Sequence, residues 1–199
     1  EESGVDAQVQ TLPHLEVELE ESEIPALKSE VDRINNFPNF KATWLEPNEI
    51  RNLEPRLTEQ LSGGVLVEDV IILDSYNLTL ATAQSAEARG AEFVLKEATG
   101  IVYEKNRAVA VMMGDERIDC DVVVLALGPW SGASSLWLDI DVPIVPQKGE
   151  IVRVEALDPP LGMHVHGDPF GNSCSIVQKG DGATWLAATV KDDTGFDVT

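Results

Sequence analysis

Apolar residues recur along this chain at several distinct spacings, and each spacing predicts a different kind of element. Over residues 22–35 they return every three or four positions, which predicts an amphipathic helix capped by Ser22. Over residues 122–127 they run without a polar interruption, which predicts a strand buried on both faces, as in parallel α/β sheets. That run ends at Gly128, where the chain must turn tightly.

Similar patterns predict the elements that precede this strand. Residues 64–67 are expected to form a strand. A helix is expected to begin at Asp74 or Ser75 and to stop at Gly90, and its small alanines suit a helix that covers a βαβ unit. Four short strands joined by tight turns are expected at residues 92–95, 100–104, 108–113 and 117–119.

The remainder of the chain predicts a short helix followed by antiparallel strands. The helix is expected over residues 131–137, directly after the turn at Gly128. Residues 150–154 form a strand pattern, and residues 173–178 and 183–190 form a hairpin pattern around a glycine-rich turn. The fold class expected from these patterns is α/β in the middle of the chain and α+β at its end.

Composition then excludes several classes of function. The chain has 35 acidic and 14 basic residues and a formal net charge of −21. Nucleic-acid and anionic-membrane partners are excluded, because neutralising phosphate groups needs clustered lysine and arginine. The dense acidity of residues 16–23 is interpreted as a solvated surface. No apolar run is long enough to span a bilayer, and a cytoplasmic location is the default expectation.

Cysteine and histidine positions predict neither a disulfide framework nor a metal site. Cys120 and Cys174 are far apart and form no CxxC motif, so both are expected to be reduced and buried. His164 and His166 alternate on an expected strand and would face the same side. Two imidazoles without a third ligand make a poor metal site, so no bound metal is expected.

Gly128 is the first candidate for a functional position. A glycine at the carboxyl end of a buried parallel strand has no Cβ to block a ligand, and open α/β sheets bind ligands at that edge. The alternative is an ordinary core strand with a turn glycine. The segment Ala126-Leu127-Gly128-Pro129-Trp130-Ser131 resembles the second flavin-contacting strand of the FAD-dependent amine and amino-acid oxidases related to D-amino acid oxidase, sarcosine oxidase and glycine oxidase.

The resemblance covers approximately residues 44–199, and the motifs that carry it occur in the order of the family. They are Leu53-Glu54-Pro55-Arg56-Leu57, the helix from Asp74 to Arg89-Gly90-Ala91, Pro146-Gln147-Lys148-Gly149-Glu150, and Asp181-Gly182 through Gly195-Phe196-Asp197. The order and spacing of several motifs are more specific than any single one.

The resemblance implies FAD as the cofactor and a set of residues that contact it. It implies backbone or close packing contacts from Ala126, Leu127 and Gly128, followed by Trp130. The residue aligned with Gly100 contacts the adenine end of FAD in the family, although a strand-end glycine without such a role is equally consistent.

No catalytic residue is assigned, because in this class the flavin accepts a hydride and the protein positions the substrate. Lys148 and Arg153 are the basic residues nearest the expected roof over the flavin. Both are interpreted as solvated or ion-paired rather than as a substrate clamp.

The resemblance implies that residues 1–63 are the helical part of the substrate domain and a connection. Residues 64–142 are expected to be a partial, Rossmann-like FAD-binding domain with a small antiparallel β layer, and residues 143–199 the substrate-domain antiparallel sheet. Family members begin with a GxGxxG turn that holds the FAD pyrophosphate, and that motif is absent here. We therefore interpret the chain as an internal segment whose partner is the remainder of a larger flavoenzyme. The segment alone is not expected to retain FAD.

The function implied is oxidation of a small amine or amino acid, of the glycine, sarcosine or D-amino acid type, by hydride transfer to FAD. Two alternatives stay open: a related flavin dehydrogenase acting on a 2-hydroxy acid or glycerol 3-phosphate, and a non-catalytic subunit that uses the fold as an interaction scaffold.

Overall fold

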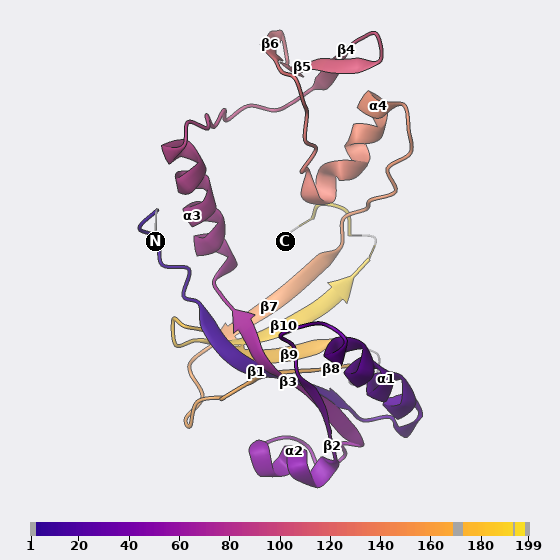
Figure 1. Ribbon diagram of the computed structural model, residues 1–199, viewed down its shortest axis with the longest axis vertical. Coiled ribbons are helices and arrows are strands. Elements are labelled where there is room, and N and C mark those ends of the chain that lie inside the picture. The colour runs from indigo at the N-terminus through magenta and orange to yellow at the C-terminus, as the bar shows by residue number, and fades with distance from the viewer. Residues whose placement is uncertain (1–2, 169–172, 193, 198–199) are drawn as a thin grey trace. The chain divides into compact units, whose positions relative to one another are not determined.

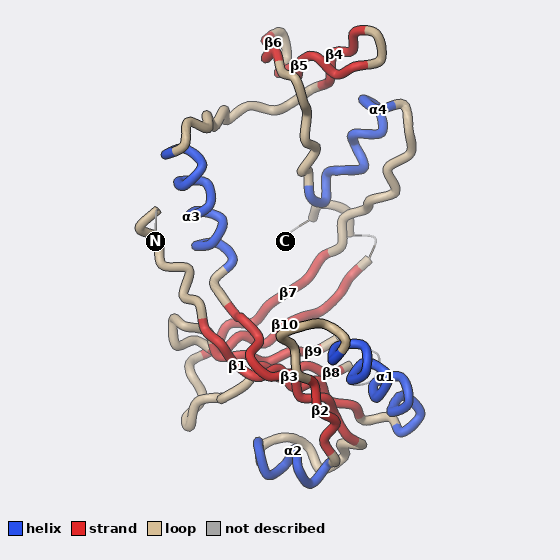
Figure 2. The backbone as a smooth tube through the Cα atoms, viewed as in Figure 1, coloured by secondary structure: helices blue, strands red, loops and turns tan. Residues whose placement is uncertain are grey.

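The computed structural model describes residues 3–168, 173–192 and 194–197. Within it the chain forms two compact units, one built from Glu1–Arg89 and Gly149–Val190 and the other from Gly90–Lys148 and Lys191–Thr199 (Figure 1). Nearly all of the large sheet lies in the first unit, whereas the second contains a small sheet and two short helical segments (Figure 2).

The first unit is organised around a seven-stranded sheet with the order β2-β3-β1-β8-β9-β10-β7. Strand β1 pairs antiparallel with β3 and parallel with β8, so the sheet is mixed. Strands β9 and β10 form the expected hairpin. The strands are β1 (Gln10–Glu18), β2 (Ala42–Leu45), β3 (Gly63–Ile72), β7 (Lys148–Val154), β8 (His164–Gly167), β9 (Cys174–Gln178) and β10 (Thr184–Lys191).

Strand β1 corrects the expectation that the first part of residues 1–63 is helical. Leu15 and Val17 are buried, whereas Glu16 and Glu18 between and after them are only partly covered. This alternation has the period of a half-buried strand, so the acidic residues occupy one face of a central strand. Residues 14–18 therefore carry a strand pattern in which acidic residues alternate with apolar ones.

Two helices cover opposite faces of the sheet at its β2–β3 end. Helix α1 (Ile24–Asn35) packs Leu27 on Ala42, Val65 and Val67. Helix α2 (Pro47–Leu53) buries Ile50 against Leu15 and Val17 on the other face. The expected helix at residues 22–35 is confirmed, but its predicted cap is wrong, because a 3-10 turn over Glu21–Glu23 precedes it and no side chain caps α1.

The second unit contains the expected small antiparallel layer. Its strands β4 (Gly100–Glu104), β5 (Arg107–Met113) and β6 (Glu116–Asp119) pair in that order. Lys105 and Asn106 both have positive φ, as the tight β4–β5 turn requires. The expected helix after Gly128 is present as the 3-10 helix η2 (Gly128–Ser134) followed by α4 (Ser135–Leu138).

Two expected strands do not form. Residues 92–95 and 122–127 have no strand structure, and Leu95, Val122 and Val124 are 104%, 76% and 81% exposed. The physical reason is that a strand needs neighbours to accept and donate its backbone hydrogen bonds. Within the part of the chain that the structure describes, no strand pairs with either segment.

Helix α3 (Ser75–Ala88) begins where the sequence predicts, because Asp74 accepts a hydrogen bond from the Asn77 N–H at 2.7 Å. None of its residues is buried, and Tyr76 is 75% exposed. The expected role of covering a sheet is therefore not seen among the described residues.

The boundary expected between residues 63 and 64 is not a boundary between the compact units. Strand β3 pairs with β1 and β2, which places residues 64–72 in the same sheet as residues 10–18. The chain instead passes from one unit to the other after Arg89, Lys148 and Val190. The assignment of whole segments to FAD and substrate domains stays a prediction.

Two smaller expectations concern the cysteines and the membrane. Both cysteines are free, but Cys174 is exposed and Cys120 is half-buried, so the expectation of burial is wrong; Cys174 begins β9, where the strand leaves the core. Among the described residues no helix combines the length and apolarity needed to cross a bilayer. The cytoplasmic location stays a prediction.

Leu15 tests the core of the large sheet, since it is fully buried between α2 and residues of the β8 region. Leu15→Ala is expected to lower the free energy of unfolding by about 2–5 kcal/mol, because the cavity adds to the lost transfer energy. Ile71→Ala on β3, where the side chain is 65% exposed, should cost less than about 1 kcal/mol. Urea unfolding followed by circular dichroism measures both, and equal costs would contradict this description of the core.

Candidate functional site

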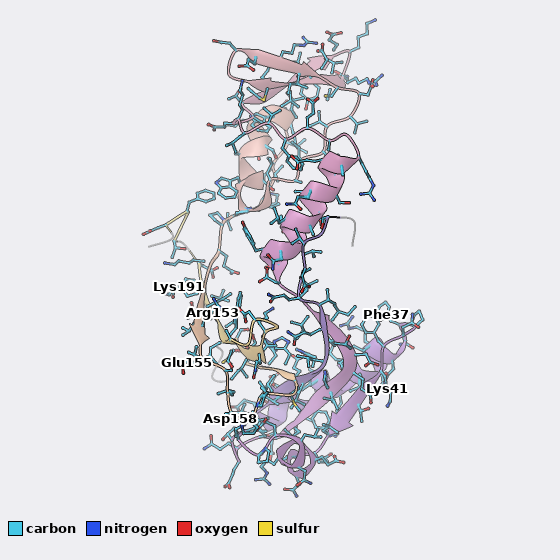
Figure 3. All side chains as sticks on the ribbon, turned by 90° about the vertical axis from the view of Figure 1, so that its left-hand side faces the viewer. Phe37, Lys41, Arg153, Glu155, Asp158 and Lys191 are labelled. Atoms are coloured by element: carbon cyan, nitrogen blue, oxygen red, sulfur yellow. The ribbon has the colours of Figure 1, made fainter. Side chains whose placement is uncertain are left out.

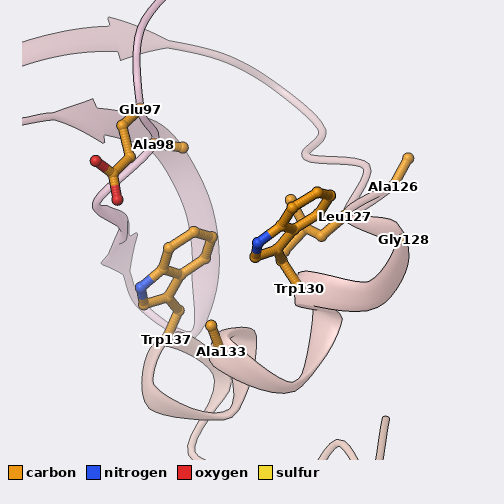
Figure 4. Close-up of a pocket in the computed structure, with 8 residues that line it drawn as sticks. All are labelled: Glu97, Ala98, Ala126, Leu127, Gly128, Trp130, Ala133 and Trp137. Atoms are coloured by element: carbon orange, nitrogen blue, oxygen red, sulfur yellow. The ribbon is translucent and has the colours of Figure 1, made fainter. Parts of the chain in front are cut away.

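A cavity of about 630 Å³ lies in the second unit, beside the turn at Gly128 (Figure 4). Its lining comes from the segment before β4, from the end of the apolar run, and from the two helical segments that follow it. The lining residues are Glu97, Ala98, Ala126, Leu127, Gly128, Trp130, Ala133 and Trp137. The cavity volume is within the range of small-molecule and cofactor pockets.

The turn at Gly128 is shaped by local backbone chemistry. Gly128 has φ +53°, a left-handed conformation that glycine adopts without steric cost. An ideal Cβ built at Gly128 would meet nothing within 4 Å, so the residue opens onto free space. Pro129 follows in the first turn of the 3-10 helix, where its missing N–H is no loss. The Trp130 N–H closes the turn on the Leu127 carbonyl at 3.1 Å.

Hydroxyl groups hold the helical segment after this turn. The Ser131 hydroxyl donates to the Gly128 carbonyl at 2.7 Å, and the Ser134 hydroxyl donates to the Ser131 carbonyl at the same distance. The Ser135 hydroxyl accepts from the Val142 N–H at 3.0 Å. These bonds tie the wall of the cavity to the chain that follows α4.

Gly132 supports the same wall by close approach. A Cβ at this position would lie 2.6 Å from the Ile144 carbonyl oxygen, a backbone atom that cannot turn aside. The helix therefore lies directly against residues 142–144, and no residue larger than glycine fits there without a backbone shift.

The opposite side of the cavity is held by the small antiparallel layer. Lys96 pairs with Glu116 of β6, and the Thr99 N–H donates to the Met112 carbonyl at 2.8 Å. These two contacts flank Glu97 and Ala98, so both lining residues are fixed from each side. Glu97 is the one ionisable side chain among the eight that line the cavity.

Two indole rings contribute most of the aromatic surface. Figure 4 shows Trp130 and Trp137 beside the same opening, with Ala133 between them on the helical segment. Trp130 is 61% exposed and stacks on Phe196, with ring centroids 5.4 Å apart and an interplanar angle of 6°. Trp137 is half-buried.

This arrangement is suited to binding rather than to bond-making chemistry by side chains. The walls are mainly apolar, glycine exposes backbone groups at the turn, and one carboxylate can accept hydrogen bonds. The lining holds no nucleophile with an adjacent base.

Four of the five predicted cofactor residues line this cavity together: Ala126, Leu127, Gly128 and Trp130. Gly100 does not; it begins β4 and pairs with Met112, and a Cβ there would meet nothing within 4 Å. Ala98, two residues earlier, takes its place in the lining. Whether any of these residues contacts a cofactor stays a prediction.

Sequence reasoning missed Glu97, Ala98, Ala133 and Trp137. Glu97 and Ala98 directly precede an expected strand of the small layer, and a shift of two residues from Gly100 would have found them. Ala133 and Trp137 follow Trp130 at spacings of three and seven, which places them near one face of a helical segment. This spacing is the sequence feature that could have identified Ala133 and Trp137 as lining residues.

The other candidate residues do not line this cavity, and each of them is paired. Arg153, labelled on β7 in Figure 3, forms an ion pair with Asp181 at 2.5 Å, and Lys148 also has a partner. Arg56 of the Leu53–Leu57 motif pairs with the buried Glu54 carboxylate at 2.6 Å, and this hydrogen bond lowers the pKa of Glu54. These contacts have structural roles. No group of three or more His, Cys, Asp or Glu residues in the described ranges is arranged to hold a metal ion.

Comparison with known proteins gives matches along the whole chain. The family model DAO, described as FAD dependent oxidoreductase, matches residues 1–199. The chain is 35% identical over 115 residues to a D-amino-acid oxidase of Bradyrhizobium diazoefficiens, covering 56% of this chain and 27% of the relative. It is 26% identical over 148 residues to a glycine oxidase of Bacillus licheniformis, covering 74% and 39%.

The structure is also similar to solved flavoprotein structures. The crystal structure of glycine oxidase from Geobacillus kaustophilus matches with a TM-score of 0.85 and 24% identity, over 98% of this chain and 52% of that one. This likeness confirms the expected fold class, and at this identity it shows the fold alone. The chain therefore spans about half of that structure, and 27% and 39% of the two curated relatives.

Gly132 offers a test of how the cavity wall is built. Gly132→Ala is expected to destabilise the second unit by about 1–3 kcal/mol, because the added Cβ overlaps the Ile144 carbonyl. Gly100→Ala is the matched control and should change the stability by less than about 0.5 kcal/mol, since its Cβ points into open space. Urea unfolding followed by tryptophan fluorescence measures both. A Gly132→Ala protein as stable as the control would rule out this close contact.

Proposed function

The chain belongs to the FAD dependent oxidoreductase family, and we propose on that basis that the cavity beside Gly128 receives part of the FAD cofactor. The observation that carries the proposal is the convergence of the Gly128 turn and two indole rings on one apolar cavity. The residues present fit such a group: Gly128 leaves open space where a side chain would project, and the walls can contact a flat aromatic ring.

We propose further that the adenosine end of FAD is the part that enters this cavity. Trp130 and Trp137 supply flat apolar surfaces for a purine ring, and the Glu97 carboxylate can accept hydrogen bonds from ribose hydroxyls. Ala98, just before β4, replaces Gly100 as the small residue that lines the cavity. The proposed contact therefore lies two positions earlier than predicted and is again made by a small residue.

The proposed reaction of the whole protein is the oxidation of a small amine or amino acid. When bound, FAD supplies the acceptor for the hydride that leaves the substrate carbon. The part of this chain is to bind and orient: the second unit holds the cofactor, and the large sheet of the first unit belongs to the substrate side. The curated relatives, a D-amino-acid oxidase and a glycine oxidase, support the amino-acid substrate class.

The same proposal accounts for the apolar segments that remain exposed. Residues 92–95 and 122–127 have the composition of buried strands, yet they are unpaired among the described residues. We propose that the remainder of the parent protein supplies the neighbouring strands, and with them the phosphate-binding turn. The coverage of 27–52% of the relatives' lengths supports this proposal.

An interaction scaffold without catalysis is the second candidate. Exposed apolar surface of this kind also suits a contact with another protein, and Leu95, Val122 and Val124 form part of it. A related flavin dehydrogenase acting on a 2-hydroxy acid or on glycerol 3-phosphate would use the same cofactor cavity and differ in the substrate. The presence or absence of bound flavin separates the scaffold from both enzymes.

The proposal is tested in the full-length protein that contains this chain. The wild-type protein is expected to purify with bound FAD, and Gly128→Val is expected to weaken FAD binding at least about tenfold, because a β-branched side chain projects into the cavity from a left-handed backbone. Gly100→Val should leave binding within about twofold of wild type, since Gly100 is outside the lining. Flavin absorbance and fluorescence titration measure both.

Each outcome distinguishes the candidates. A Gly128→Val protein that still carries stoichiometric FAD contradicts the cavity assignment. A colourless wild-type protein that takes up no added FAD supports the scaffold instead. The 199-residue chain alone is expected to take up no FAD, because the adenosine end by itself provides too little contact area.

A further inference from the structure

All three histidines of the chain lie together at one position of the large sheet. His14 of β1 stands directly opposite His164 of β8, and Glu16 stands opposite His166. Side chains at alternate positions of neighbouring strands point to the same face, so these four side chains share one face of the sheet. The sequence indicated that His164 and His166 face one side, but not that His14 joins them.

The His14 and His164 rings make direct contact through like atoms. Their Nδ1 atoms are 3.0 Å apart, and their ring centroids are 4.7 Å apart. One Nδ1 must therefore carry a hydrogen and donate, while the other must be bare and accept. The bond cannot exist when both rings are protonated, because both Nδ1 atoms are then donors.

This contact lies at the junction of the two halves of the sheet. Strands β2, β3 and β1 form one half, and β8, β9, β10 and β7 form the other. In the part of the chain that the structure describes, the two halves are hydrogen-bonded through the β1–β8 ladder, which pairs residues 14–17 with residues 164–167. On the opposite face the junction is closed by Leu15, Val17 and Val165, all buried.

Burial is the main effect that opposes protonation of His14 and His164, while the nearby charged groups act in both directions. Glu16 of β1 lies 3.8 Å from the His166 ring, and the ammonium of Lys179, after β9, also acts on His164. Burial lowers the pKa of His14, with opposing effects from Glu16 and His166. Burial first, and then His14, His166 and Lys179, lower the pKa of His164 to about 4. Toward β3 the neighbours of His14 and Glu16 are the apolar Val67 and Val65.

We propose that the His14–His164 pair is an acid-sensitive contact in the sheet: the neutral pair stabilises the β1–β8 ladder, whereas protonation of both rings removes the acceptor, breaks the hydrogen bond and loosens the ladder. The apolar face remains in place, so the expected change is local opening of β1 and β8 before the whole unit unfolds. Such a contact would make the geometry of this sheet depend on pH in mildly acidic conditions. The inference does not depend on the proposed cofactor.

The direction of the pH effect follows from proton linkage. Above the usual histidine pKa of 6.5 both the closed and the open ladder are unprotonated, and the contact contributes its full stability. Between 6.5 and about 4 the open state takes up a proton that the closed state does not, so acidification favours opening. For one proton, the opening constant rises up to about tenfold per pH unit in this window.

Amide hydrogen exchange over pH 7.5–4.5, corrected for intrinsic exchange rates, measures this opening. Wild-type β1 and β8 amides are expected to lose protection as the pH falls, while β9–β10 amides change less. His164→Asn retains a polar group close to the Nδ1 position but cannot titrate, so only His14 of the pair can still take up a proton and the opening constant should depend less steeply on pH than in the wild type. His166→Gln is the control: the His166 Nε2 atom contacts the Ser173 hydroxyl at 3.1 Å, outside the His14–His164 pair. This variant should keep most of the wild-type dependence of the opening constant on pH.

An NMR titration of the unsubstituted chain tests the proposal even if a variant does not fold. Histidine NMR signals of the 199-residue chain can only come from this cluster, because it contains every histidine. The His164 signal is expected to titrate well below the usual histidine pKa, in step with the loss of β1–β8 protection. Protection that does not vary with pH, a His164 signal with an ordinary pKa, or a His164→Asn protein with the wild-type slope would each overturn the proposal.

Discussion

Whether a strand finds partners for its backbone hydrogen bonds decides which apolar segments of this chain become ordered sheet. Strand β1 is central because β3 and β8 accept and donate its hydrogen bonds on both sides, and its acidic residues do not prevent this. The run at residues 122–127 is far more apolar, yet it forms no strand among the described residues. Hydrophobicity alone therefore does not produce a strand, because each unpaired peptide group must remain accessible to water.

The same constraint explains what could be predicted from the sequence. Local signals worked well: Asp74 caps α3, Lys105 and Asn106 form the β4–β5 turn, and β9 and β10 form the expected hairpin. Pairing between distant segments could not be predicted, because nothing local specifies that residues 14–17 lie beside residues 164–167. Strand β1 was missed for a different reason, since its alternation of leucine, valine and glutamate was interpreted only as surface charge.

The candidate site was predictable to the extent that it is local. Ala126, Leu127, Gly128 and Trp130 are nearly contiguous, and a single turn brings them to one cavity. Glu97 and Ala98 reach that cavity through the small antiparallel layer, which requires the β4–β5–β6 pairing to be known first. The predicted contact at Gly100 is therefore two residues away from Ala98, which lines the cavity in the structure.

The histidine cluster illustrates a property that sequence patterns did not reveal. Two of its members are close in sequence, but the contact between His14 and His164 joins residues 150 positions apart. This contact and the cavity beside Gly128 lie in different units, so cofactor binding and acid sensitivity can be measured separately.

The central claim is that residues 122–127 form a paired strand in the full-length protein and so present Gly128 to the cofactor. Amide hydrogen exchange of these residues, compared between the full-length protein and the 199-residue chain, tests it most directly. The account predicts strong protection in the full-length protein and little in the chain alone. Equally rapid exchange of residues 122–127 in both proteins would contradict it.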